Sequence, residues 1–301
     1  MRAVKAAFVL CFLTTSVGCS PRAYVLGKVA DGVSSGGAVF ATDDDPELVR
    51  EAVPFALKAE EALLERNPDH RGLLTSLCRG FTQFASAFVW QDAVEEADRE
   101  RAAAGKERAR RLFLRAKEYG LRGLEAGHPG FRERLVADPD HAVSLVERQD
   151  VPLLFWTAAS WSLAIAASGG SPAMLADLSR CESLMRRALS LEEDFDHGAI
   201  HEYFVAFEGG RPEAMGGSLA DARRHFGRAM ELGGGKRISP MVTFAETVSV
   251  RTQDRKEFLA LLSRVLAFDA RGEAPEFRLA NLLAQRKARW LTGRVDELFL
   301  E

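Results

Sequence analysis

The spacing of apolar residues along this chain predicts an all-α protein. Stretches rich in Ala, Leu, Arg and Glu dominate the sequence, runs that alternate apolar and polar residues are few, and only three Tyr occur. These features are typical of helices that bury one face, whereas strands show alternation. The balance of 47% hydrophobic and 28% charged residues is that of an ordinary globular protein.

One segment departs from the amphipathic pattern, because residues 151–168 carry no charge. Asp150 can cap the free N–H groups of a helix start, Pro152 suits the first turn, and Gly169-Gly170 ends the run. A helix that is apolar on every side must be surrounded by protein or by lipid. Its length only just reaches that of a membrane span, and its many Ala, Ser and Thr residues favour close helix packing. We therefore expect the central buried helix of a helical stack.

Helix boundaries elsewhere follow from capping residues and from Pro. Asp45 and Pro46 predict the start of a helix that runs to about Arg66. A second helix is expected from about residue 71 to Trp90, and the charged residues 91–107 predict either its solvated extension or a hairpin arm. Further helices are predicted after Ser171-Pro172, over 219–231 after Ser218, over 241–252 after Ser239-Pro240, after Asp254 with Glu257 as a capping box, and over 276–291.

A spaced triplet of residues recurs along three of these helices. Small residues at its first and last positions allow a neighbouring helix to approach, and a larger middle residue fills the gap. This is the second-helix signature of a tetratricopeptide repeat. We expect a degenerate tetratricopeptide-like α-solenoid of roughly ten to twelve helices, in a single domain over residues 43–301. The triplets are Ala109, Phe113 and Ala116; Cys181, Met185 and Ala188; and Ala222, Phe226 and Ala229.

The first residues are typical of a targeting segment that lies outside the fold. Arg2 and Lys5 form a positive region before a short apolar one. Residues 1–18 then read as a lipoprotein signal peptide, with cleavage between Gly18 and Cys19 and lipidation of Cys19. An ordinary secretory signal with a chance Cys is the alternative. Residues 19–42, rich in Gly, Ser and Ala, predict a flexible tether with room for one short helix.

Groups that could carry catalysis or bind a metal are few. His197 and His201 are four residues apart and could face one metal ion on a helix, but no third ligand stands at a convincing spacing, so structural roles are favoured. Cys78 and Cys181 lie on apolar helix faces and are expected to be buried free thiols, with a disulfide as the alternative. We predict no enzyme activity, no cofactor and no metal. A net charge of −3 without a basic stripe argues against nucleic-acid binding.

Aromatic residues gather on the central helix and on a later one. Core packing between stacked helices accounts for most of them. Some could instead line an apolar cavity for a hydrophobic ligand, because cores and pockets use the same residue types. Both interpretations stay open at this stage. The residues are Phe155, Trp156 and Trp161, followed by Tyr203, Phe204 and Phe207.

Six segments together carry a family resemblance that covers nearly all of the chain after the signal. They include RARRLFLRAKEYGLRGLE and GAIHEYFVAFEGGRPEAMGGSLADARRHFGRAMEL. The chain resembles the T component (TatT) of tetratricopeptide-protein-associated tripartite ATP-independent periplasmic (TRAP) transporters. The segments are residues 43–58, 108–125, 150–168, 198–232, 253–269 and 278–291.

The resemblance implies a non-enzymatic accessory lipoprotein of a TRAP-type transport system, which faces the periplasm. It implies docking of the periplasmic solute-binding protein (the P component), assembly as a homotrimer, and a channel that passes a hydrophobic small molecule. The residue after the lipidated Cys is Ser20. Asp at this position would favour retention at the inner membrane, so Ser20 favours anchoring in the outer membrane. The residues that we expect to line a ligand cavity are Phe155, Trp156, Trp161, His201, Glu202 and Tyr203.

Two other functions stay open from the sequence. Tetratricopeptide stacks bind extended peptides in a concave groove, so the chain could be an envelope scaffold for peptide or protein partners. An enzyme is the third hypothesis, and it rests only on His197 and His201.

Overall fold

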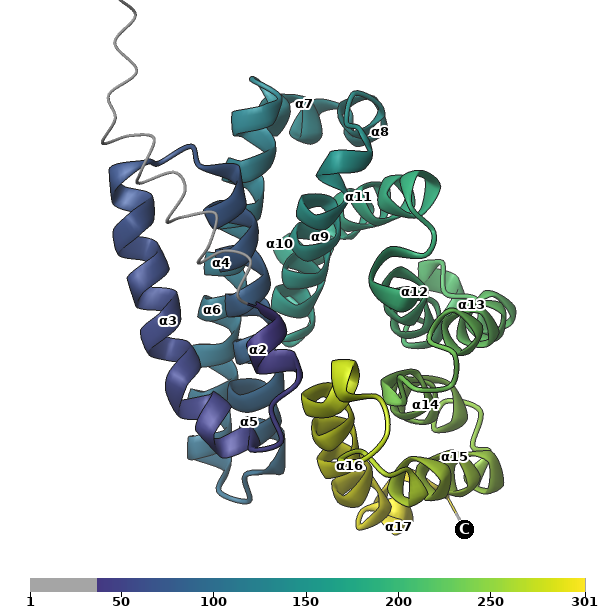
Figure 1. Cartoon of the computed structure of the whole chain (residues 1–301). Coiled ribbons are helices and arrows are strands. Elements are labelled where there is room, and N and C mark those ends of the chain that lie inside the picture. Colours follow the sequence, from purple (N-terminus) through teal and green to yellow (C-terminus); the bar gives the residue numbers. More distant parts are fainter. Residues whose placement is uncertain (1–36, 301) are drawn as a thin grey trace, which may run out of the picture.

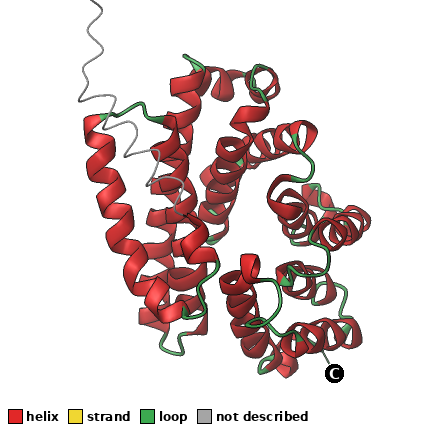
Figure 2. Cartoon of the chain, in the orientation of Figure 1, coloured by secondary structure: helices red, strands yellow, loops and turns green. Residues whose placement is uncertain are grey.

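The computed structural model describes residues 37–300, which form helices joined by short loops, with no β-strand among them (Figures 1 and 2). The expected all-α class is therefore confirmed. The helices of the N-terminal part are α2 (Gly37–Ala41), α3 (Pro46–Arg66), α4 (Arg71–Phe84), α5 (Gln91–Glu95), α6 (Arg99–Gly127), α7 (Phe131–Ala137), α8 (Pro139–Ser144) and α9 (Val151–Ala166). Those of the C-terminal part are α10 (Pro172–Leu175), α11 (Leu178–Leu191), α12 (Ala199–Gly209), α13 (Leu219–Leu232), α14 (Ser239–Phe244), α15 (Arg255–Ala267), α16 (Arg278–Thr292) and α17 (Val295–Leu298).

Capping residues set several of the boundaries that the sequence predicts. The Asp45 carboxylate accepts hydrogen bonds from the backbone N–H groups of Glu47 and Leu48 at the start of α3. Ser218 accepts from the N–H of Asp221 at the start of α13, and Asp254 caps α15. Each side chain satisfies an N–H group that has no partner within the helix, and this fixes the first turn.

Two helices change to a π-helical turn where the sequence predicts an unbroken α-helix. The helix that begins at Arg71 becomes π-helical over Ala85–Trp90, and the one that begins at Ser239 does so over Ala245–Ser249. A π-helical turn adds one residue to the backbone ring and is hard to foresee from residue spacing. These breaks and several short helices raise the number of helical segments above the ten to twelve expected.

The repeated triplets mark the helices that pack most closely against a preceding partner. Helix α6 packs against α4, α11 against α9, and α13 against α12. In α6, Ala109, Phe113 and Ala116 are fully buried, as the spacing predicts. The α6–α9 crossing is closer still, because a Cβ built on Gly120 would lie 2.1 Å from Oγ1 of Thr157. Small residues therefore set the distance between neighbouring helices.

Helix α9 is buried between α6, α4 and α11, as expected for the uncharged segment. None of the described helices is both long and apolar enough to cross a membrane. Asp150, which we expected to cap α9, makes no side-chain bond to its first turn. Its buried carboxylate instead accepts hydrogen bonds from Arg71, from His128 at 2.9 Å and from the N–H of Glu147 at 2.9 Å. It therefore ties the starts of α4 and α9 to the end of α6.

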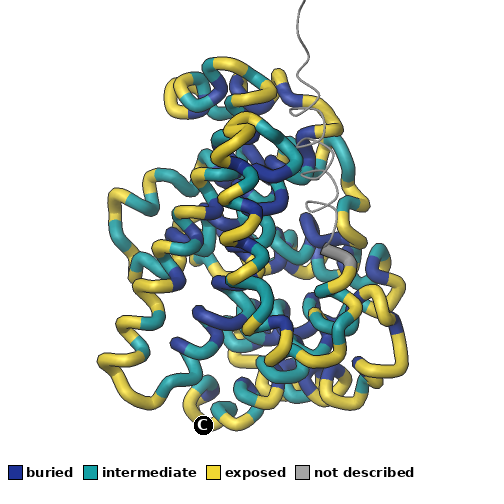
Figure 3. Tube along the Cα trace, turned by 60° about the vertical axis from the view of Figure 1, so that its left-hand side comes forward, coloured by how far each residue is buried: buried dark blue, intermediate teal, exposed yellow. Residues whose placement is uncertain are grey.

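The helix pairs follow one another around a common centre, and the chain closes on itself (Figure 1). Helix α16 returns to lie against α2 and α3. Buried residues lie on the facing sides of neighbouring helices and exposed residues on the outside (Figure 3). Helix α2 falls within residues 19–42, which we expected to form a tether, and Phe40 packs on the core beside α3. The signal peptide, Gly18 and Cys19 lie outside the described residues.

Candidate functional site

The predicted cavity-lining residues of α9 divide between the core and a partly open stripe. Phe155 is buried and makes an edge contact with the Trp156 ring, with 4.8 Å between ring centroids. Phe155 also touches Phe195, in the turn before α12. Trp156 itself is only half-buried, and it shares its side of the helix with the half-buried Pro152 and Ala159. This stripe is only partly covered by the neighbouring helices.

Trp161 has a polar environment that its sequence context does not suggest. Its indole Nε1 donates a hydrogen bond to Asp177 at 3.2 Å, and the ammonium group of Lys117 lies 4.3 Å from the ring centroid. A buried indole N–H needs such an acceptor, and the cation interacts with the ring face. Trp161 is therefore held by α6 and by the loop before α11, and it is 5% exposed. It belongs to the core and not to an open cavity wall.

Tyr203 connects α12 to the central helix. Its hydroxyl lies 2.8 Å from Oγ of Ser162, and either oxygen can be the donor. The ring stacks on Phe207 at 5.4 Å and meets Phe204 edge-on. Burial, with the nearby Cys181 thiol as a smaller cause, raises the pKa of Tyr203 well above its usual value. The phenol therefore stays protonated and acts as a hydrogen-bonding strut between α9 and α12.

Glu202 contacts α14, whereas Tyr203 contacts α9. Its carboxylate accepts hydrogen bonds from Ser239 at 2.9 Å and Thr243 at 3.1 Å, and it pairs with Arg237 at 2.9 Å. All three partners belong to α14 or to the turn that precedes it. A carboxylate with this many donors is satisfied, so its role is to join α12 to α14.

His201 does not act with His197, with which the sequence pairs it. His197 lies in the preceding turn, and its ring packs edge-on against Phe277. His201 lies on α12, and its Nδ1 is 2.8 Å from Nδ1 of His225 on α13. Its Nε2 lies 3.3 Å from the Glu193 carboxylate. No group of three or more His, Cys, Asp or Glu in the described part of the chain is arranged to hold a metal ion.

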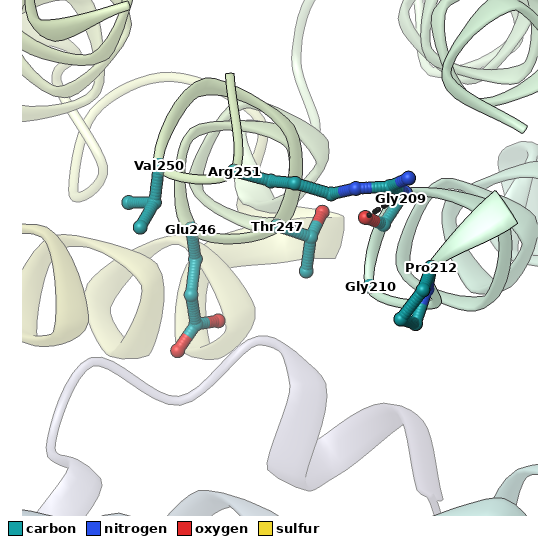
Figure 4. A pocket seen from close by; sticks show the side chains of 7 residues that line it. All are labelled: Gly209, Gly210, Pro212, Glu246, Thr247, Val250 and Arg251. Carbon is teal, nitrogen blue, oxygen red and sulfur yellow. Dashed lines mark hydrogen bonds between the residues drawn. The ribbon is translucent and has the colours of Figure 1, made fainter. Parts of the chain in front are cut away.

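A pocket of about 390 Å³ lies where the end of α12 meets the π-helical turn Ala245–Ser249 (Figure 4). Arg251 reaches across it, and its Nη1 donates to the carbonyl of Gly209 at 3.2 Å and to that of Arg211. Glu246 lines another part of the pocket and pairs with Lys287 of α16 at 2.5 Å. The pocket thus has a cation and an anion on its wall, both already engaged by protein groups. Its lining residues are Gly209, Gly210, Pro212, Glu246, Thr247, Val250 and Arg251.

Four of the six predicted site residues, Phe155, Trp156, Trp161 and Tyr203, pack in one hydrophobic core, and none of the six lines this pocket. Phe155 and Trp161 lie in the core, Tyr203 contacts α9, Glu202 contacts α14, and His201 contacts α13. No motif in the sequence predicts this pocket. Its one local signal is the Gly209-Gly210 pair at the end of α12, where a Cβ built on Gly209 would lie 2.7 Å from Val248 of the π-helical turn.

Cys78 and Cys181, the cysteines of the described residues, are free and buried, as expected. Cys78 lies close to Gly120 and Thr157, at the crossing of α4, α6 and α9. Cys181 lies on α11, where it occupies the first position of a triplet. Burial raises the pKa of each thiol to about 12, so neither is a nucleophile at neutral pH.

Almost all of the described residues match known proteins. The family model for the TRAP transporter T-component matches residues 42–299. An uncharacterized protein of Treponema pallidum (strain Nichols) is 30% identical to this chain over 269 residues, which cover 87% of this chain and 83% of that protein.

Proposed function

Because the chain belongs to the TRAP transporter T-component family, we propose that it docks the periplasmic solute-binding protein of a TRAP system. The family is one of accessory transporter subunits and is not a known enzyme family. The observation that carries the proposal is the match over residues 42–299, since it spans α3 to α17 and not one repeat alone. A match to a single helix pair would indicate only a tetratricopeptide-like fold.

The proposed location is the periplasmic side of a membrane, with the outer membrane favoured over the inner. It rests on the signal-like residues 1–18, on Cys19 as the lipidated residue and on Ser20 after it. Two acyl chains on one residue hold a protein stably at a bilayer. Growth of cells with labelled palmitate should label the wild-type chain, and the variant Cys19→Ser should be unlabelled. Labelling of that variant would contradict the anchor.

We also propose that the chain passes a hydrophobic ligand, and the open stripe on α9 supports this. Trp156 offers a large apolar ring that neighbouring helices only half cover. Such a ring can contact an apolar ligand without repacking the core. Native mass spectrometry of purified protein should then detect a bound lipid or other apolar molecule, which Trp156→Ala reduces. Trp290→Ala, which removes a half-buried Trp on α16, is the matched control and should retain the ligand.

Docking can be tested by crosslinking in intact cells. The full chain, lipidated at Cys19 and tagged at its C-terminus, should recover a TRAP-type solute-binding protein identified by mass spectrometry. The family resemblance also implies a homotrimer, and crosslinked masses separate self-association from capture of a partner. Recovery of the chain alone, from cells that express a TRAP-type binding protein, would argue against docking.

A further inference from the structure

The circle of helices closes where α16, near the end of the described chain, meets the first helices of that chain. Helix α16 lies against α2 and α3 there, close to α5, although some 190 residues separate the contacting groups (Figure 1). We call this contact between α16 and α2, α3 and α5 the seam. Elsewhere each helix pair is joined to the next by a short loop. The seam therefore joins the two ends of the described chain, and no short loop crosses it.

Ion pairs on α5 form the centre of the seam. Nη2 of Arg286 on α16 donates to Asp92 at 2.7 Å and to Glu95 at 2.5 Å. Arg50 of α3 shares Asp92, at 2.5 and 2.9 Å. Burial alone would raise the pKa of Asp92, but the two guanidinium groups hold it below its usual value. The carboxylate is thus charged at neutral pH and holds α3 and α16 together.

Polar contacts also form the edge of the seam. Arg271, in the loop before α16, pairs with Asp44 at 3.0 Å, and Arg278 donates to the carbonyl of Thr42 at 3.0 Å. The Arg286 side chain is 30% exposed and that of Asp92 is 40% exposed. Ion pairs that reach solvent to this extent are weak individually and are screened by salt.

Apolar packing binds α16 to the C-terminal helices more firmly than to the seam. Its buried residues Ala284, Ala288 and Leu291 belong to the core formed with α14 and α15. Towards α3 and α4 it contributes only Leu279 and Leu283, which are half-buried. Loss of the seam would thus leave α16 attached to its own core.

We propose that the seam is an electrostatic latch, at which the closed circle of helices opens sideways between α16 and the N-terminal helices. Opening separates Arg286 from Asp92 and Glu95 and exposes Leu279 and Leu283, while the three cores stay packed. It would admit a partner segment or a ligand to the inner helix faces from the side. The latch goes beyond the proposed docking function and does not depend on which partner binds.

The chain offers a matched control for this proposal in the residue next to Arg286. Lys287 is also a cation of α16 with a carboxylate partner, Glu246, at 2.5 Å. Its partner belongs to the C-terminal helices, so its ion pair does not cross the seam. Arg286→Ala and Lys287→Ala therefore remove a similar interaction from one helix, and only the first should affect the latch.

Cysteine accessibility measures the opening directly. In the full chain carrying Cys11→Ser and Cys19→Ser, Leu283→Cys places a thiol inside the seam, and the native thiols Cys78 and Cys181 stay buried. We expect Arg286→Ala to raise the rate at which this thiol reacts with a maleimide by roughly tenfold, since it removes two partly exposed ion pairs. Arg286→Lys should restore most of the protection, and Lys287→Ala should leave the rate unchanged.

Salt tests the latch without removing Arg286. Raising the ionic strength from about 0.05 to 1 M should increase the reaction rate of the Leu283→Cys thiol, because the Debye length falls to about 3 Å and partly exposed ion pairs are weakened by screening. A thiol at Leu262→Cys, in the C-terminal core, should stay unreactive throughout. Equal rates in Arg286→Ala and Lys287→Ala, or a rise at position 262 that matches the rise at 283, would overturn the proposal.

Discussion

The Nδ1 atoms of His201 and His225 lie 2.8 Å apart, so one imidazole donates its Nδ1 proton to the other, whose own Nδ1 must be unprotonated. Both side chains are buried between α12 and α13, and His225 stacks on Phe204 with 4.9 Å between ring centroids. Full protonation of both rings would remove the Nδ1 acceptor and put two like charges in contact. Burial, followed by the charge of Arg224, lowers the pKa of His225 to about 4, and burial also lowers the pKa of His201.

This pair predicts that stability falls as the pH drops below about 6.5. The unfolded chain binds a proton on each imidazole near that pH, whereas His225 in the folded chain binds one only near pH 4. The stabilisation is thus complete above about pH 6.5 and is lost between there and pH 4. Urea titrations give the free energy of unfolding of the wild type and of His225→Gln. The wild type should exceed the variant by about 1–2 kcal/mol more at pH 7.5 than at pH 5. An advantage that does not change with pH would show that the pair does not titrate in this way.

Asp150 should be among the carboxylates whose neutralisation destabilises the fold most. It is fully buried and has Arg71, His128 and the Glu147 N–H as donors, and these hold its pKa below the usual value against the opposing effect of burial. Asp150→Asn should lower the free energy of unfolding by about 3 kcal/mol, because it leaves the Arg71 charge without its partner. Asp296→Asn, at a carboxylate that is 83% exposed, should change it by less than about 0.5 kcal/mol. Equal effects in urea denaturation would contradict this reading.

Two helical glycines should respond to alanine in opposite directions. At Gly120 the added Cβ would meet Oγ1 of Thr157 at 2.1 Å, so Gly120→Ala forces α6 and α9 apart and should destabilise by about 1–3 kcal/mol. At Gly227 on α13 nothing lies within 4 Å, and alanine should stabilise the helix by about 0.5–1 kcal/mol. Thermal denaturation of both variants tests the helix spacing, and a stabilised Gly120→Ala would mean that the two helices are less close.

The buried thiols give a prediction about reactivity. Cys78 and Cys181 should resist alkylation at pH 8 in the folded protein, because burial keeps their pKa near 12 and the reagent cannot reach them. Both should react fully in denaturing urea. Alkylation timed by mass spectrometry on Cys19→Ser protein separates the two states. Rapid modification of either thiol without denaturant would indicate local opening of the α4–α6–α9 crossing or of α11.

Much of the secondary structure could be read from local rules. The Asp45, Ser218 and Asp254 caps mark helix starts that the structure confirms, since each acts on N–H groups two or three residues away. The Ala109 triplet predicts a buried face, because residues at that spacing lie on one side of a helix. The π-helical turn at Ala85–Trp90 escaped prediction, since no residue spacing identifies it.

The candidate site was less predictable. The sequence placed Trp156 and Trp161 on one helix, but only the packing of α6 and α11 decides that the first is partly open and the second enclosed. His201 seemed to belong with His197, four residues away, whereas its partner His225 comes from the next helix. A sequence pattern predicts which residues are neighbours within one helix. It does not predict which residues of two different helices are in contact.

The sequence by itself determined the helical class, the capped helix starts, the buried triplets and the family, because each depends on residues close together or on the pattern of the whole chain. Only the tertiary structure decided three sets of contacts. These are the ion pairs of Arg286 with Asp92 and Glu95, the hydrogen bond between His201 and His225, and the hydrogen bond of Arg71 to Asp150. These contacts depend on how far each helix pair turns relative to the previous one. Small turns add up along the chain, and their sum brings α16 back to α3.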